Sequence, residues 1–184
     1  MGKGKRADAV LFGFDFQVNA AIVLMLENIK ELQSLRLESE NEDIDIKLYS
    51  GSHILAQAKA IVNSSTDFTN VRNNLKKALK SLSEGSKKVQ TEKLILITNS
   101  PNPLNEDASR SIFWGPARRG FNTLPESAQK IITGYLSQMD QPLDTDQFVI
   151  QVVPFETDDD AERYKAVSTI RYQFCWFNCY FTLK

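Results

Sequence analysis

The chain has 184 residues, of which 42% are apolar and 24% charged, and this suits one domain or one domain with a short appendage. Its 22 basic and 23 acidic side chains give a formal net charge of −1, which excludes a strongly basic, histone-like binder but not a local basic groove. No apolar run reaches the ~18–20 residues that span a bilayer, and no signal-peptide pattern follows the basic N-terminus. We therefore expect a cytoplasmic protein without a membrane partner.

The first third of the chain predicts one buried helix followed by three strands. Phe14–Ile29 is apolar around most of a helical circumference, which is typical of a buried helix. Leu35–Ser39 is a short strand candidate, and Glu42–Tyr49 alternates apolar and charged residues with the period of a strand. After a turn signal at Ser50–Ser52, His53–Val62 predicts a returning strand. We expect these three strands to form an antiparallel meander.

An amphipathic helix and a buried strand follow the meander. Phe68–Ser83 predicts the helix, because its apolar residues recur at helical spacing. That apolar stripe consists of Val71, Leu75, Leu79 and Leu82. Glu92–Thr98 is a nearly continuous apolar run, which indicates a strand covered on both faces. Asn99–Arg119 is rich in Pro, Asn, Ser and Gly and predicts a long loop.

The remaining chain predicts two more helices, another strand and an aromatic segment. Pro125–Ser137 is a helix with its proline near the first turn, Gln147–Phe155 is a strand, and Thr157–Ala166 is a further helix. Ile170–Leu183 is dense in aromatic residues and must be buried, either as a core strand or as a surface for self-association or for a downstream domain. Strands that alternate with helices after a meander indicate an α/β fold, with a mixed central sheet flanked by helices.

Several common kinds of site are missing from the sequence. Two cysteines, Cys175 and Cys179, cannot form a four-thiolate zinc site, and the only histidine, His53, is distant from them along the chain. Neither the phosphate-binding loop G-x-x-x-x-G-K-[ST] nor a strand-borne G-x-G-x-x-G is present. Cysteine-based zinc chemistry and the use of ATP or dinucleotides are therefore not supported.

Polar side chains on the second and third predicted strands carry the chemical signal. Asp43 and Asp45 share one face of their strand, because residues two apart in a strand point the same way. Gln57 and Lys59 share a face of the returning strand for the same reason. Since a tight turn joins the two strands, the predicted fold brings an acid beside a glutamine and a lysine.

These side-chain types suit phosphodiester hydrolysis. Mg²⁺ or Mn²⁺ takes oxygen ligands, which a carboxylate and an amide carbonyl supply. A nearby lysine orients the attacking water and stabilises the negative charge that grows on the phosphate. Lys59 lies among apolar neighbours in its strand, where an unpaired ammonium group is costly. It therefore needs an acidic partner, either Asp43 or Asp45. The alternative is a solvated strand face, on which cross-strand Asp–Lys pairs are common.

The same stretch resembles a known group of nucleases. Glu38, Glu42–Ile46 and Ile54–Lys59 are similar to the active-site core of PD-(D/E)XK nucleases, in the Mrr-like variant where Gln replaces the second acid in a Q-x-K motif. Gly13–Gln17, followed by an apolar helix, is similar to the start of one branch, the N-terminal double-stranded-DNA endonuclease domain of SAVED-containing CBASS anti-phage effectors. The resemblance covers about residues 10–100 and implies a restriction-endonuclease-like core.

The resemblance implies a role for each matching residue. Asp43 matches the metal-binding aspartate, and Gln57 matches the second acid position, where it would supply a carbonyl ligand. Lys59 matches the catalytic lysine. Gln17 and Glu38 match positions whose role is at most a supporting one.

Two features depart from the resemblance. Asp45 shares the face of Asp43, so it remains the alternative metal ligand. The chain also ends soon after the catalytic core at 10–100, since residues 100–184 hold only the remaining strands and helices and the aromatic segment. We expect one nuclease-like domain over residues 1–184, and we leave open a homo-oligomer and a separate sensor domain or partner protein.

A basic stripe on the amphipathic helix supplies candidate DNA contacts. Arg72, Lys76 and Lys80 recur every four residues, and Lys87 and Lys88 follow the helix. Such a stripe, coming after the active-site strands, would run along the phosphates of a DNA duplex. The alternative is a plain solvated helix face.

The sequence therefore supports two main hypotheses. The first is an Mg²⁺- or Mn²⁺-dependent endonuclease for double-stranded DNA, acting as an effector module in anti-phage defence. The second is a catalytically silent nuclease-like module that binds nucleic acid or assembles an effector, and an RNA-directed nuclease on the same scaffold is a third reading. The first two differ in whether Asp43, Gln57 and Lys59 converge within the ~5 Å that shared metal coordination requires.

Overall fold

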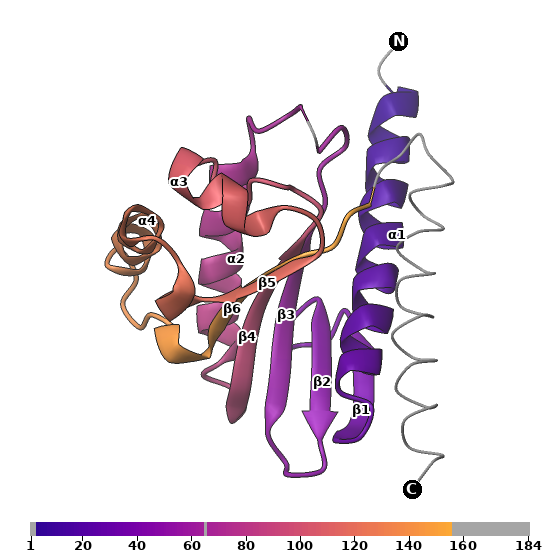
Figure 1. Ribbon diagram of the computed structural model, residues 1–184. Helices are drawn as coiled ribbons and strands as arrows, with labels where there is room; N and C mark the ends of the chain where they lie inside the picture. The colour runs from indigo at the N-terminus through magenta and orange to yellow at the C-terminus, as the bar shows by residue number, and fades with distance from the viewer. Residues whose placement is uncertain (1–2, 65, 156–184) are drawn as a thin grey trace, which may run out of the picture.

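The computed structural model describes residues 3–64 and 66–155 (Figure 1). Three features expected from the sequence lie outside the described residues: the helix at Thr157–Ala166, the aromatic segment Ile170–Leu183 and both cysteines. The helix, meander and central strands that carry the candidate site all lie within them.

A six-stranded mixed sheet forms the centre of the fold, in the order β1-β2-β3-β4-β6-β5. Strands β1, β2 and β3 form the antiparallel meander that the alternating segments predict. Strands β3, β4 and β6 run parallel, and β5 pairs antiparallel to β6 at the other edge. The strand bounds are Leu32–Leu37 (β1), Ile44–Leu48 (β2), His53–Lys59 (β3), Thr91–Thr98 (β4), Ala117–Gly120 (β5) and Phe148–Val152 (β6).

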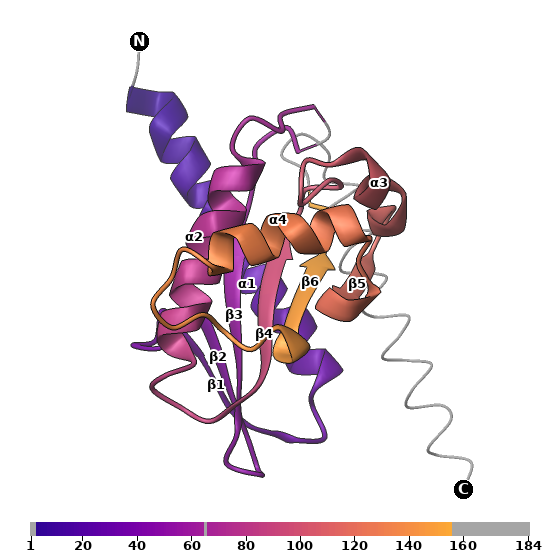
Figure 2. The ribbon, with the colours of Figure 1, turned by 90° about the vertical axis from the view of Figure 1, so that its left-hand side faces the viewer.

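Helices cover both faces of this sheet (Figures 1 and 2). α1 (Lys3–Glu27) packs on one face, while α2 (Val71–Gly85) and α4 (Glu126–Leu136) cover the other, with the short α3 (Asp107–Arg110) near α4. Short 3-10 helices lie at Ser111–Phe113, Phe121–Thr123 and Thr145–Gln147. The protein is thus an α/β fold with a mixed sheet flanked by four helices, as the sequence predicts, and it is consistent with a restriction-endonuclease-like core.

The sheet separates two apolar cores. Ile44 and Ile46 of β2 are fully buried in the core beneath α1, whereas Leu55 of β3 is buried in the core beneath α2 and α4. Strand β4 sends Leu94 and Ile95 to opposite cores, which confirms that it is covered on both faces. The apolar stripe predicted for α2 is also buried: Val71, Leu75, Leu79 and Leu82.

Helix α1 is longer than its apolar pattern predicts. It begins at Lys3 rather than at Phe14, and it ends at Glu27. Phe16 and Leu24 are fully buried against the sheet, as expected of a core helix. Val10 and Leu11, nearer the N-terminus, are more than half exposed, because that end of α1 extends beyond the sheet (Figure 2).

By length and composition, α1 could cross a membrane. Its stretch Asp8–Glu27 has a mean hydropathy of 1.8, so the expectation that no apolar stretch reaches spanning length is wrong. That expectation considered only unbroken apolar runs, and Asp15, Gln17 and Asn19 interrupt the stretch. Core helices of soluble proteins meet the same criteria. One face of α1 packs on the sheet, and the described chain has the fold of a soluble α/β domain.

The segment Asn99–Arg119 is not the long loop that its composition predicts. It contains α3, a 3-10 helix and most of the edge strand β5. The sequence of β5, A-R-R-G, has neither alternation nor β-branched residues, so periodicity cannot detect it. Among the described residues β5 pairs with β6, and that backbone pairing rather than local propensity makes it a strand.

Candidate active site

Four side chains gather at one end of the β2–β3 hairpin; we call Glu42, Asp43, Gln57 and Lys59 the Asp43 cluster. Lys59 is the last residue of β3, and Asp43 directly precedes β2. Because Ile44 pairs with Ala56, the next position along the hairpin places Asp43 opposite Gln57. The cluster lies at the carboxyl end of β3, which is parallel to β4, and open α/β sheets bind ligands at such an edge.

Lys59 and Asp43 form an ion pair within the cluster. Lys59 Nζ lies 3.5 Å from Asp43 Oδ2, and the two side chains are 23% and 25% exposed. The same Oδ2 accepts a hydrogen bond from the backbone amide of Ala58 at 3.2 Å. Asp43 therefore supplies the acidic partner that Lys59 requires. Since both side chains remain partly exposed, a substrate phosphate can reach them.

Glu42 and Gln57 form the buried half of the cluster. Gln57 Nε2 donates a hydrogen bond to Glu42 Oε2 at 3.0 Å, and the backbone amide of Asp43 donates to the same oxygen at 3.1 Å. Both residues are only 5% exposed. Glu42 Oε1 is buried and has no hydrogen-bond partner of good geometry among the described residues. Gln57 thus reaches the residue beside Asp43 rather than Asp43 itself.

Burial raises the pKa of the Glu42 carboxyl to about 7. The nearby Ser81 hydroxyl and the Asp43 backbone amide oppose this shift. The negative charge of Asp43 raises the pKa of Glu42 further, and the positive charge of Lys59 lowers it. Glu42 is therefore electrostatically coupled to both partners of the exposed ion pair.

The two residues expected to support the site meet on the opposite side of Asp43. Gln17, from α1, donates from Nε2 to Glu38 Oε1 at 2.8 Å and to the backbone carbonyl of Asp43 at 3.1 Å. Glu38 follows β1 with a positive φ of 48°. Gln17 therefore links α1 to the backbone at the start of β2, which fits a positioning role.

Asp45, the alternative metal ligand, has other partners. Its Oδ1 lies 2.7 Å from His53 Nδ1, and its Oδ2 accepts a hydrogen bond from Asn41 Nδ2 at 2.7 Å. Asp45 is 5% exposed and lies opposite Leu55 in the hairpin. Among the described residues Lys59 pairs with Asp43, so Asp43 and not Asp45 is the carboxylate that the structure places beside the lysine.

The oxygen donors of the Asp43 cluster suit a hard divalent cation. They are the carboxylates of Asp43 and Glu42 and the amide of Gln57, the ligand types that Mg²⁺ and Mn²⁺ prefer. Within the described part of the chain, no group of three or more His, Cys, Asp or Glu side chains is placed to hold a metal. The unpartnered buried oxygen of Glu42 fits a cation, because an added positive charge would satisfy it.

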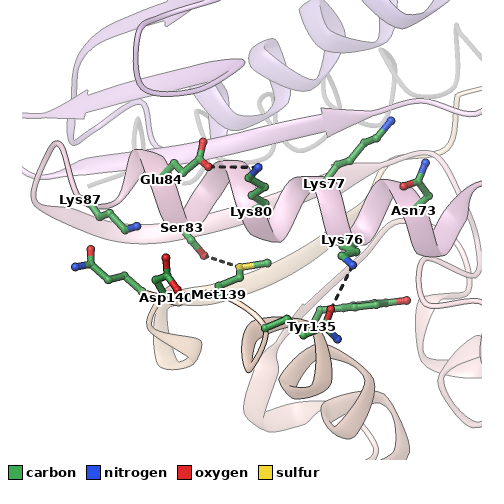
Figure 3. Close-up of a pocket in the computed structure, with 12 residues that line it drawn as sticks. Asn73, Lys76, Lys77, Lys80, Ser83, Glu84, Lys87, Tyr135, Met139 and Asp140 are labelled. Carbon is green, nitrogen blue, oxygen red and sulfur yellow. Dashed lines mark hydrogen bonds and ion pairs between the residues drawn. The ribbon is translucent and has the colours of Figure 1, made fainter.

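A groove of about 580 Å³ lies between α2 and α4 (Figure 3). Its charged lining residues are Lys76, Lys77, Lys80, Lys87, Glu84 and Asp140. Lys76 Nζ donates to Gln138 Oε1 at 3.3 Å and lies 5.9 Å from the centroid of the Tyr135 ring. Lys80 Nζ lies 3.9 Å from Glu84 Oε1. The predicted basic stripe therefore faces α4.

The opposite side of α2 approaches the Asp43 cluster. A Cβ added to Gly85 would lie only 2.6 Å from the carbonyl oxygen of Asn41, and Lys88 Nζ donates to the carbonyl of Glu40. Arg72, also predicted to contact DNA, donates from Nη2 to the carbonyl of Asn105 at 3.1 Å. The structure thus does not bring the stripe of Arg72, Lys76 and Lys80 to the side of α2 that carries the cluster.

Sequence reasoning assigned no role to two residues near the site. Glu42 begins the alternating segment Glu42–Tyr49, but the two-residue period puts it on the face opposite Asp43, and β2 itself begins only at Ile44. Lys77 lies one helical turn before Ser81, on the same side of α2, and its side chain points away from α4 (Figure 3). The spacing of Lys77 and Ser81 was visible in the sequence, but the proximity of Ser81 to Glu42 was not.

No protein-family model matches the chain, and neither a curated protein nor a solved structure shows significant similarity to it. Its function must therefore be inferred from the Asp43 cluster and the surrounding fold.

Proposed function

We propose that the protein is a metal-dependent endonuclease of the PD-(D/E)XK type that hydrolyses phosphodiester bonds in double-stranded DNA. The ion pair of Lys59 and Asp43 carries this proposal, because it joins a lysine and a carboxylate, both partly exposed, at the carboxyl end of β3. Gln57 lies beside them, bonded to Glu42. This pairing supports the catalytic hypothesis over the catalytically silent module, in which Lys59 would face Asp45 across open solvent and Gln57 would point away.

In this proposal, Asp43 and Gln57 hold Mg²⁺ or Mn²⁺ through their side-chain oxygens. When bound, the cation neutralises phosphate charge and lowers the pKa of water. The Lys59 ammonium orients the attacking water and stabilises the negative charge that grows on the phosphate oxygens. Asp43 holds that ammonium at the open edge of the sheet.

We also propose that this nuclease acts in the cytoplasm as an effector module of anti-phage defence. Three separated segments of the family resemblance meet in space, since Gln17 bonds both Glu38 and the Asp43 carbonyl, and this contact supports the family proposal. Double-stranded DNA is the proposed substrate. A sensor domain, a partner protein or a second copy of the chain is the proposed means of activation.

Cleavage of supercoiled plasmid tests the catalytic proposal. The purified wild-type protein is incubated with Mg²⁺, Mn²⁺ or EDTA, beside Asp43→Asn and Lys59→Ala. We expect metal-dependent cleavage that falls by about 100-fold or more in each variant, because each loses a group that touches the reacting atoms. Lys47→Ala, which removes an exposed lysine of β2, is the matched control and should cleave like the wild type.

Cleavage that survives in EDTA, or in both variants, would contradict the proposal. Duplex binding by the wild-type protein without cleavage in either metal would indicate the catalytically silent module instead. Preference for an RNA duplex over the plasmid would retain the chemistry and overturn the proposed substrate.

A further inference from the structure

Glu42 Oε1 is a buried carboxylate oxygen without a partner of good geometry among the described residues. Burying a charged or polar atom without a hydrogen bond is costly. An apolar residue at this position would avoid that cost. Ser81 of α2 lies close enough to act on the Glu42 carboxyl, but no hydrogen bond of good geometry to Oε1 forms within the described chain, so Oε1 has room for a ligand that the protein alone does not supply.

The orientation of Glu42 is fixed by several contacts. Its Oε2 accepts hydrogen bonds from Gln57 Nε2 and from the Asp43 amide. Ser39 holds the backbone on the other side, because its Oγ accepts from the Glu42 amide and donates to the Glu42 carbonyl, each at 3.1 Å. Because Oε2 is hydrogen-bonded and Ser39 holds the Glu42 backbone, the position of Oε1 is fixed in the absence of a ligand.

The charges around Glu42 indicate which ligand would suit it. The Asp43 amide donates to Glu42 Oε2, and the Asp43 carboxylate pairs with Lys59, so Glu42 lies directly beside the partly exposed ion pair. Two adjacent carboxylates repel each other, and a divalent cation shared between them would remove that repulsion. Mg²⁺ and Mn²⁺ take oxygen ligands of this kind.

We propose that Glu42 supplies, through Oε1, the second carboxylate of the metal site, and that Gln57 positions it by donating its amide N–H. This inference rests on the proposed nuclease function and deepens it. The position of the second acid on β3 is occupied by Gln57, an amide without negative charge. Glu42, which precedes Asp43 on the neighbouring chain segment, restores a pair of carboxylates to the site.

Calorimetric titration of the full chain with Mn²⁺ tests this proposal without an activity assay. We expect one Mn²⁺ site in the wild-type protein, and an affinity about 10–100-fold weaker in both Glu42→Gln and Asp43→Asn. Glu40→Gln is the matched control, since Glu40 is exposed on the same loop, and it should bind Mn²⁺ like the wild type. Thermal unfolding in EDTA shows that each variant is folded before titration.

The outcomes separate this inference from the function on which it rests. Wild-type affinity in Glu42→Gln, together with a loss in Asp43→Asn, would overturn the role of Glu42 and leave the nuclease proposal standing. An absence of Mn²⁺ binding by the wild-type protein would overturn both. Equal weakening in Glu40→Gln and Glu42→Gln would show a general effect of loop charge and would also overturn the specific role of Glu42.

Discussion

Glu42 and Asp43 are adjacent carboxylates that the fold places in different surroundings. Asp43 is partly exposed and paired with Lys59, whereas Glu42 is buried beside Gln57. Burial disfavours the charged form of a carboxyl group, and an adjacent cation favours it. Burial thus raises the pKa of Glu42, while its neighbour Asp43 keeps a partly exposed carboxylate beside Lys59.

We expect Glu42→Gln to change how stability depends on pH in EDTA. Folded Glu42 has a pKa of about 7, against an ordinary value of 4.5, so it keeps its proton while the unfolded chain releases one. Raising the pH through that interval therefore destabilises the folded wild type, by ~3 kcal/mol in total, and stability levels off above the folded pKa. The variant should lack this loss and should be the more stable protein at about pH 8.

Chemical denaturation between about pH 5 and about pH 8 measures this difference. Glu40→Gln should follow the wild-type curve, because Glu40 is exposed. Parallel pH dependences for the wild type and Glu42→Gln would show that Glu42 does not retain its proton in the folded protein.

The sequence could predict part of the site and not the rest. Asp43, Gln57 and Lys59 follow from the two-residue period of strands and from a tight hairpin, both of which are local. The same period puts Glu42 on the opposite face from Asp43, and its burial depends on packing near Ser81 of α2, far along the chain. Asp43 and Asp45 are equivalent by periodicity, and their separation depends on His53 and Asn41, which bind Asp45.

Helix α2 approaches the loop before β2 closely enough to require a glycine. A Cβ at Gly85 would lie 2.6 Å from the Asn41 carbonyl oxygen and 3.0 Å from a Leu55 methyl carbon. The first of these atoms belongs to the backbone, so it cannot move aside as a side chain does. The C-terminal end of α2 therefore helps to set the position of the loop that carries Glu42.

We expect Gly85→Ala to destabilise the protein by about 1–3 kcal/mol, because overpacking displaces the neighbouring backbone. Gly134→Ala in α4 is the matched control, since nothing lies within 4 Å of its added Cβ. That control should stabilise the protein by about 0.5–1 kcal/mol through helix propensity. Urea denaturation compares the two, and equal effects would contradict the close contact at Gly85.

Elements with strong periodicity were predicted correctly, and those formed by distant pairing were not. The meander, α2, β4 and α4 each have their own apolar pattern, so their positions follow from the sequence. Strand β5 has no such pattern and exists through its pairing with β6, about 30 residues later in the chain. The first turns of α1 likewise lie beyond the apolar stretch that faces the sheet.

At the scale of the molecule, the basic groove reaches from α4 across the surface of α2. Lys76, Lys77 and Lys80 all line it, and Lys77 points away from α4, on the side of α2 that carries Ser81 near Glu42 (Figure 3). A duplex whose phosphate reaches Asp43 would pass Lys77 before the other two lysines. Lys80 is also partly neutralised by Glu84, an exposed ion pair of small energetic value.

We therefore expect Lys77→Glu to weaken duplex binding more than Lys80→Glu. The loss of one phosphate contact at Lys77 should lower the slope of log affinity against log salt by about 1. Fluorescence anisotropy with a labelled duplex, measured at several salt concentrations in EDTA, gives both quantities. A larger effect at Lys80 would place the duplex in the groove between α2 and α4 instead.

Gln17 reaches across from α1 to the carbonyl of Asp43, while the Asp43 side chain faces Lys59 on the other side of the hairpin. Asp43 is therefore held by α1 through its backbone and by Lys59 of β3 through its side chain. Losing the Gln17 contact alone would let the start of β2 shift while both apolar cores stay intact. The proposed nuclease could therefore lose its activity without unfolding. Its activity would depend on α1, although α1 carries none of the proposed catalytic residues.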